Sequence, residues 1–269
     1  MARQKGLLKY TGNLGGISHY RQKGVSGHLA RMANGPSAEQ IASDPAFRRT
    51  RENNKEFQGC AQVGKDLRGF FAKLIKSSAD SFITGRLVKV LKQVNLADGV
   101  NPRGQRSIAI SLAPEKLRFF EFNRNLSLDT VFSPDYAVTE NGSKNEATVD
   151  VQPFTPVDEM DIPAGATHFR LILAIASLSD YAYEPIEKNY QPVNPDENGL
   201  QATAFSPYLP VSQDIAANTV LTATLAGGPA ISATTGLVCA LGVEYYQEVN
   251  GVHYLFAQGN ATRVVEVFV

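Results

Sequence analysis

The spacing of apolar residues divides the chain into an N-terminal part with helical periodicity and a C-terminal part with strand periodicity. From Phe57 to Leu74, apolar residues recur every three or four positions, which is the spacing of an amphipathic helix. Asp44 followed by Pro45 is a strong helix start, because aspartate caps the first turn and proline suits its first position. We therefore expect a helix over about residues 45–76.

A second helix is predicted to begin at Asp80, with apolar positions from Ile83 to Val94. Only about three residues separate the two helices, which favours an antiparallel helical hairpin. Upstream, residues 6–33 alternate short apolar runs with Gly-rich turns, and this pattern predicts a small β-meander. A meander with so few large side chains is marginal alone, so it must pack on the rest of the chain or on another copy.

The C-terminal part has the pattern of an antiparallel β-sandwich. Residues 95–107 are rich in Gly, Pro and Asn, and we interpret them as a linker between domains at 1–106 and 107–269. Asn250-Gly251 is typical of a two-residue hairpin turn of type I′. The fold class is therefore α+β, with an immunoglobulin- or jelly-roll-like sandwich after the helical hairpin. The expected strands lie in residues 116–123, 147–154, 168–179, 219–226, 237–249, 252–258 and 261–269.

The formal net charge of zero hides a strong polarisation. Residues 1–106 hold 19 Lys and Arg against 7 Asp and Glu, whereas residues 107–269 hold 7 against 19. The balances of +12 and −12 leave three explanations open besides plain solvated charge. The basic half binds nucleic acid, or an acidic membrane surface, or the acidic half of the same or a neighbouring chain.

The basic side chains of the two helices are the candidate interface or polyanion-binding residues. Arginine pairs with carboxylates and with phosphates in the same bidentate manner, so residue type does not separate a protein partner from nucleic acid. The intervening Glu52 and Glu56 partly neutralise the first turns. The candidates are Arg48, Arg49, Arg51, Lys55, Lys65, Arg68, Arg86 and Lys89.

The sequence contains no motif of a catalytic, cofactor-binding or metal-binding site. None of the four histidines has a ligand or acid partner at helical spacing, and the Gly cluster at 12–16 lacks phosphate-loop spacing. The acidic pairs near Asp158 and Asp196 lack the spacing of a calcium loop, so we interpret them as solvated loop charge. Cys60 and Cys239 are expected to be reduced, buried thiols. We therefore predict a protein that is not an enzyme and has no cofactor.

The N-terminal residues are basic but lack the apolar run of a signal peptide, and no stretch approaches the length of a membrane span. The expected location is cytoplasmic, or outside the cell by a route that needs no classical signal peptide.

Several segments resemble a known group of sequences. These are MARQKG at residues 1–6, GNLGGISHY at 12–20, the following LAR, DPAFRRTRENNKEF at 44–57 and VEYYQEVNG at 243–251. Together they are similar to a family of uncharacterised proteins from Bacteroidota genomes, over most of the chain. The resemblance implies a bacterial protein and supplies no catalytic residues.

Opposite charge on the two halves and an unsupported meander favour a structural protein that assembles with itself into a ring, tube, filament or shell. The apolar C-terminal strand adds to this, because it must lie inside a sheet or leave an edge for strand addition. A nucleic-acid-binding or capsid- or phage-tail-like protein is one alternative. A ligand- or carbohydrate-binding β-sandwich module is another.

Overall fold

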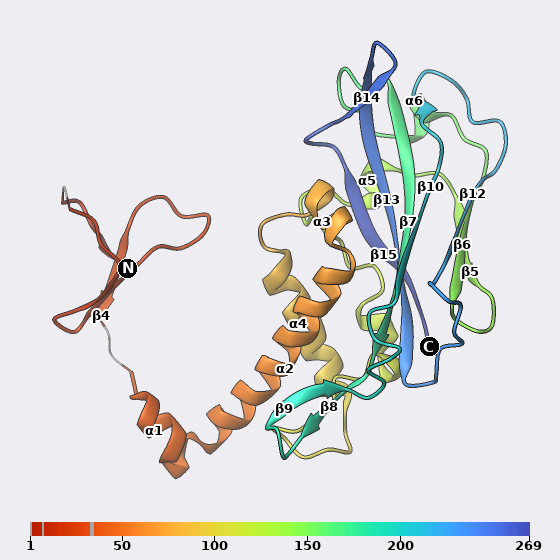
Figure 1. Cartoon of the computed structure of the whole chain (residues 1–269). Helices are drawn as coiled ribbons and strands as arrows, with labels where there is room; N and C mark the ends of the chain where they lie inside the picture. Colours follow the sequence, from red (N-terminus) through yellow and green to blue (C-terminus); the bar gives the residue numbers. More distant parts are fainter. Residues whose placement is uncertain (1, 7, 33–34) are drawn as a thin grey trace. The chain divides into compact units, whose positions relative to one another are not determined.

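The chain divides into two compact units, Met1–Arg51 and Glu52–Val269, which we term the N-terminal unit and the body. The computed structural model describes residues 2–6, 8–32 and 35–269 (Figure 1). Leu7 and Ala33 of the predicted meander lie outside these ranges. The units meet at 51/52, whereas the change in composition predicts a boundary at 106/107. The difference arises because both long helices belong to the core of the body.

The N-terminal unit contains the predicted meander as a four-stranded antiparallel sheet. Its strands are β1 (Ala2–Arg3), β2 (Gly12–Leu14), β3 (Ile17–Tyr20) and β4 (Leu29–Met32), in the order β1-β4-β3-β2. The short helix α1 (Ala38–Ser43) follows, and Ser37 and Gln40 form a capping box at its start. Asp44 accepts a hydrogen bond from the Ala46 N–H and so caps a 3₁₀ turn, η1 (Pro45–Phe47), as the Asp-Pro pair predicts.

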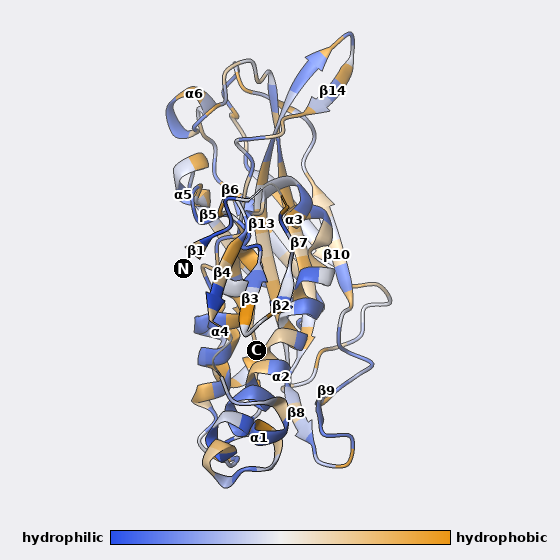
Figure 2. Ribbon diagram, turned by 90° about the vertical axis from the view of Figure 1, so that its left-hand side faces the viewer, coloured by the Kyte–Doolittle hydropathy of each residue, from blue (hydrophilic) through white to orange (hydrophobic). Residues whose placement is uncertain are grey.

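The helical hairpin of the body is present but is divided differently from the prediction. Helix α2 (Arg48–Phe70) ends six residues early, and α3 (Ala72–Ser78) and α4 (Ile83–Ala97) complete the helical layer. Hydrophobic and hydrophilic residues alternate along α2 and α4 in Figure 2, as expected of helices with one buried face. The buried residues of α2 include Cys60, Val63 and Leu67, which pack with Leu87 and Leu91 of α4.

The central sheet is built on two long strands, β7 (His168–Ser179) and β13 (Thr235–Val249), which pair along their length. Strand β10 (Gln201–Phe205) and the short β11 (Leu209–Pro210) pair with the outer edge of β7. Strands β14 (Val252–Leu255) and β15 (Ala261–Phe268) pair with the outer edge of β13. Asn250 and Gly251 between β13 and β14 both have positive φ, at 54° and 79°, which confirms the predicted tight turn.

A smaller sheet of β12 (Thr219–Thr224), β6 (Glu146–Val151) and β5 (Tyr136–Glu140) covers one face of the central sheet, and the helices cover the other (Figure 1). Alternate residues of β7 and β13 enter two separate cores, which explains why these strands are apolar almost throughout. The α+β fold with a sandwich-like pair of sheets is therefore as predicted. The remaining elements are β8 (Tyr181–Glu184), β9 (Asn189–Pro192), α5 (Leu128–Val131), α6 (Pro156–Glu159) and the 3₁₀ turns η2 (Ile110–Leu112) and η3 (Pro114–Lys116).

The strand predicted at 116–123 is wrong. The segment leaves η3 in an irregular path, with Phe119 at a φ of 64°, and forms a single bridge from Glu121 to Arg263. It nevertheless bonds to the outer edge of β15, where Phe119 N–H donates to the Val264 carbonyl and Phe122 N–H to that of Thr262. This part of the edge is therefore not available for strand addition by another chain.

The linker predicted at 95–107 is also wrong, because the segment is fixed to the body. Asn95 ends a polar network in which Lys92 pairs with the buried Glu56, and Glu56 in turn accepts the Gly104 N–H. Asp98 closes the same segment by accepting hydrogen bonds from both the backbone and the hydroxyl of Ser107. Its Gly and Pro residues shape a tight loop rather than a flexible connection.

Candidate assembly surfaces

One face of the N-terminal sheet carries a row of exposed apolar side chains. Leu14 pairs with Ile17, and Ile17 pairs with Met32, so the three side chains lie side by side on one face of three adjacent strands. Their exposed fractions are 63%, 37% and 63%. We term Leu14, Ile17 and Met32 the apolar row.

The described part of the N-terminal unit has no hydrophobic core of its own. Among residues 2–6, 8–32 and 35–51, Leu29 is the one buried hydrophobic side chain. Leu8, Tyr10 and Val25 are exposed as well as the apolar row. Short strands without a buried face are marginally stable in water, and an apolar patch of this kind marks a docking surface.

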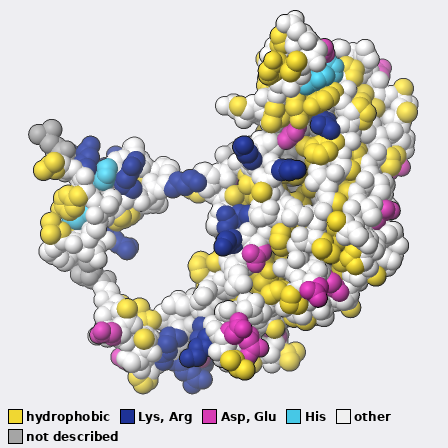
Figure 3. All heavy atoms as spheres, in the orientation of Figure 1, with side chains coloured by type: hydrophobic (Ala, Val, Ile, Leu, Met, Phe, Trp, Pro, Cys, Tyr) yellow, Lys and Arg dark blue, Asp and Glu magenta, His cyan; other side chains and the backbone are white. Residues whose placement is uncertain are grey.

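The two units carry opposite charge. Residues 1–51 hold 9 Lys and Arg against 2 Asp and Glu, a balance of +7, and residues 52–269 hold 17 against 24, a balance of −7. In Figure 3, Lys and Arg side chains predominate over Asp and Glu on the N-terminal unit, whereas both kinds are scattered over the body. A basic, apolar surface is complementary to an acidic one, and such charge speeds and orients association.

Several of the sequence-predicted interface arginines have roles within the chain. Arg51 donates hydrogen bonds of 2.8 and 2.9 Å to the carbonyls of Ile41 and Asp44, which closes the end of α1. The Nε of Arg68 donates to the Gly64 carbonyl at 3.0 Å along α2. Arg48 and Arg49 are exposed at the start of α2. Arg51 and Arg68 thus stabilise helices within the chain, whereas the exposed Arg48 and Arg49 keep positions suited to an interface.

The candidate lysines of α2 lie on its exposed side. The Nζ of Lys55 lies 5.2 Å from the ring centre of Tyr183, a cation–π contact with the β8–β9 hairpin. Lys65 is exposed on the same helix.

Arg86 and Lys89 are brought together in a basic surface groove on the body. The groove has a volume of about 390 Å³ and also contains Lys116, Arg118 and Phe119. Neither Lys116 nor Arg118 was a candidate from the sequence, because both belong to the segment interpreted as a strand. The structure thus unites two predicted residues with two that helical spacing alone does not identify.

Most cations of this groove already have carboxylate partners. Arg86 pairs with Asp80 at 2.8 Å, Arg118 with Glu266 at 3.0 Å and Lys116 with Glu115 at 3.3 Å. A phosphate polymer would compete with these carboxylates for the same cations. The groove therefore carries less free positive charge than its composition suggests, and this argues against nucleic acid as its main ligand.

Two groups in the groove have unusual local environments. Burial raises the pKa of Glu121 to about 7, although the Leu128 N–H and the nearby Arg263 guanidinium favour its charged form. Phe119 is 56% exposed and lies under two guanidinium groups, with Arg118 4.7 Å and Arg263 5.2 Å from its ring centre. A phenylalanine with positive φ is strained, and the flanking cations help to hold it in place.

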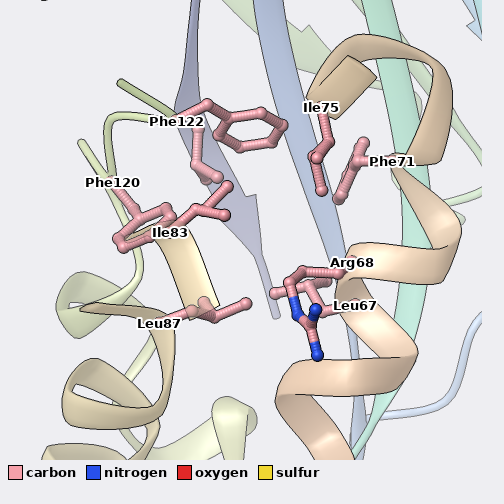
Figure 4. A pocket seen from close by; sticks show the side chains of 9 residues that line it. Leu67, Arg68, Phe71, Ile75, Ile83, Leu87, Phe120 and Phe122 are labelled. Carbon is pink, nitrogen blue, oxygen red and sulfur yellow. The ribbon is translucent and has the colours of Figure 1, made fainter. Parts of the chain in front are cut away.

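The gap between the helices and the segment at 120–122 is not a ligand site. It is lined by residues of α2, α3, α4 and β15 together with Phe120 and Phe122, and its volume is about 10 Å³ (Figure 4). That is room for about one water molecule, and the lining is almost wholly apolar. It is a packing gap in the helical core.

The two cysteines do not resemble reactive thiols. Both are buried and unpaired, as expected. Burial raises the pKa of Cys60 to about 12 and also raises that of Cys239. Since the thiolate is the reactive form, neither residue is suited to act as a nucleophile.

No protein-family model, curated protein or solved structure matches this chain. The similarity to uncharacterised Bacteroidota sequences therefore remains a prediction. Among the described residues, no helix combines the length and apolar character needed to cross a membrane.

Proposed function

We propose that this chain is a structural protein that assembles with itself, and that the apolar row of one copy docks on the acidic body of another. The observation that carries the proposal is the N-terminal unit, whose described residues bury a single hydrophobic side chain. The balance of +7 against −7 supports a body as the docking partner rather than a second N-terminal unit. A contact between two different surfaces is heterologous, so repetition gives a ring, tube or filament according to closure.

Light scattering coupled to size-exclusion chromatography tests the proposal on the full chain at low and high salt. We expect a mass several times 29.1 kDa at low salt, falling as salt screens the charge. The double variant Leu14→Ser, Met32→Ser should elute at the mass of a single chain in both buffers, because it removes the outer members of the apolar row.

Ile186→Ser is the matched control, since Ile186 is an 89% exposed isoleucine in the body. Its elution should match that of the wild type. A single-chain mass for the wild type at every salt concentration would refute self-assembly and favour a ligand-binding sandwich module. A high ratio of absorbance at 260 to 280 nm in the assembled peak would instead indicate bound nucleic acid.

A further inference from the structure

Three side chains with metal-binding atoms converge at the end of the body that carries the β13–β14 hairpin. His168, Glu248 and His253 each offer a ligand atom, and these atoms all lie within 4.8 Å of one another. Figure 3 shows histidine side chains gathered at this end of the body, open to solvent. His168 lies on β7, Glu248 on β13 and His253 on β14. His168 precedes the other two by 80 positions or more.

The strand register places all three side chains on one face of the sheet. Glu248 lies opposite His253 in the hairpin, and Tyr246, two residues before Glu248, lies opposite His168 on β7. Residues that face each other across strands, or are two apart along one strand, point to the same side. The convergence therefore follows from the backbone pairing and not from side-chain rotamers alone.

Hydrogen bonds orient the imidazole of His168 for a ligand. Oγ1 of Thr167 accepts the Glu248 N–H at 2.8 Å, and it lies 3.0 Å from Nδ1 of His168 and 3.4 Å from the Tyr246 carbonyl oxygen. The other ring nitrogen, Nε2, faces the Glu248 carboxylate at 3.6 Å. When a metal ion binds Nε2, Nδ1 carries the proton and donates to Thr167, which is the outer-shell contact usual for a metal-binding histidine.

Aromatic packing holds the second histidine. The ring of Tyr208 stacks on His253 at 3.9 Å with an angle of 4° between the planes, and it also contacts Tyr246 edge-on at 4.9 Å. The guanidinium of Arg170 lies 4.9 Å from the centre of the Tyr208 ring. Arg170 on β7 lies opposite Glu244 on β13. His253 is thus packed against Tyr208 on one side, and its ring meets that of His168 edge to face, with 4.8 Å between the ring centres.

We propose that His168, Glu248 and His253 bind a divalent transition metal ion of the zinc class, with a fourth position open to water or to another ligand. Two imidazole nitrogens and one carboxylate favour such an ion over calcium or magnesium, which prefer oxygen ligands. Ligand atoms around tetrahedral zinc lie about 3.4 Å apart, from bond lengths of roughly 2.1 Å. Small side-chain rotations therefore close the present separations. The bound ion ties the β13–β14 hairpin to the start of β7.

The test is a zinc titration of the untagged full chain after treatment with a chelator, followed by calorimetry, with cobalt(II) as a spectroscopic probe. We expect one ion per chain, intense visible absorption from tetrahedral cobalt and a rise in the melting temperature on adding zinc. His253→Ala should weaken binding by more than 100-fold. Thr167→Val removes the contact to His168 together with the hydrogen bonds to the Glu248 N–H and the Tyr246 carbonyl, and it should weaken binding by about 10- to 100-fold.

His28→Ala is the control, because His28 belongs to the N-terminal unit and should leave the affinity unchanged. Glu248→Gln is the second ligand variant. The side chain of Glu248 is 40% exposed, so this substitution should leave the folding of the chain unaffected. The proposal is overturned if the wild type binds no zinc, if Glu248→Gln binds zinc as tightly as the wild type, or if His28→Ala loses as much affinity as His253→Ala.

Discussion

Asp98 is a carboxylate whose charge organises the loop after α4. It accepts hydrogen bonds from the N–H groups of Val100, Asn101 and Ser107 and from the side chains of Asn101 and Ser107. Burial alone would raise the pKa of Asp98, but these hydrogen bonds outweigh it and hold the pKa well below its ordinary value of 3.8. The charged form is therefore the one that stabilises the folded chain.

This linkage gives a stability difference with a defined pH dependence. Because the folded pKa is depressed, the contribution of Asp98 is present above about pH 4 and is lost as the pH falls through the folded value. Asp98→Asn should lower the free energy of unfolding by roughly 1–3 kcal/mol at pH 7. The reason is that the side-chain NH₂ group of asparagine is a hydrogen-bond donor and would face the N–H and O–H donors that the carboxylate now accepts from. Urea unfolding at pH 7 and at pH 3 measures the gap between variant and wild type, which should narrow at pH 3.

Asp214→Asn is the control for this prediction, because Asp214 is exposed. It should change stability by less than about 0.5 kcal/mol at both pH values. An Asp98→Asn gap that is equal at pH 7 and pH 3 would show that the charge of Asp98 is not what stabilises the loop.

At the scale of elements, two of the three glycines of α2, Gly59 and Gly69, lie in opposite environments. A Cβ added to Gly59 would lie 2.6 Å from Cγ of Tyr190, far inside van der Waals contact, whereas one added to Gly69 would meet nothing within 4 Å. The Tyr190 ring is held in place because its hydroxyl donates to the Arg106 carbonyl at 2.9 Å. Gly59 thus allows α2 to approach the β8–β9 hairpin closely.

The same substitution should therefore have opposite effects at the two positions. Gly69→Ala should stabilise the protein by roughly 0.5–1 kcal/mol, the ordinary preference of a helix for alanine. Gly59→Ala should destabilise it by about 1–3 kcal/mol, because overpacking against Tyr190 exceeds that preference. Chemical denaturation of the two variants measures both signs, and a stabilising Gly59→Ala would contradict the close packing of α2 on the hairpin.

The element scale also shows how far periodicity could predict this fold. The strand at residues 168–179 was predicted with the bounds it has, because a strand buried on both faces has an unbroken apolar run. The segment at 116–123 was not, because Leu117, Phe120 and Phe122 are buried without a strand backbone. The predicted linker failed since its partner, Glu56, lies 48 residues before Gly104, beyond any local pattern.

The candidate sites show the same limit. Leu14 and Ile17 were visible as meander residues, but their exposure and their alignment with Met32 depend on strand register. His168 and His253 lack a local ligand pattern, because a sheet brings them together across β7, β13 and β14. Local periodicity predicts the strands on which these residues lie, but it does not predict which strands become neighbours or in which register they pair.

At the scale of the whole molecule, the proposed contact joins two different surfaces, and this has a consequence for mixtures. A chain with Leu14→Ser and Met32→Ser cannot dock its own apolar row, but its acidic body remains able to accept the row of a wild-type chain. In a heterologous assembly the variant therefore joins and then stops growth. If the contact were isologous, with one apolar row against another, the variant would be excluded.

Mixing a fluorescently labelled double variant with an equal amount of the wild type distinguishes these cases. We expect the label to co-elute with wild-type chains in assemblies of lower mass than those of the wild type alone, because each incorporated variant caps one end. The label should leave the assemblies at high salt, where attraction between the +7 and −7 units is screened. A label that elutes only at the mass of a single chain would show that two copies of the apolar row must meet.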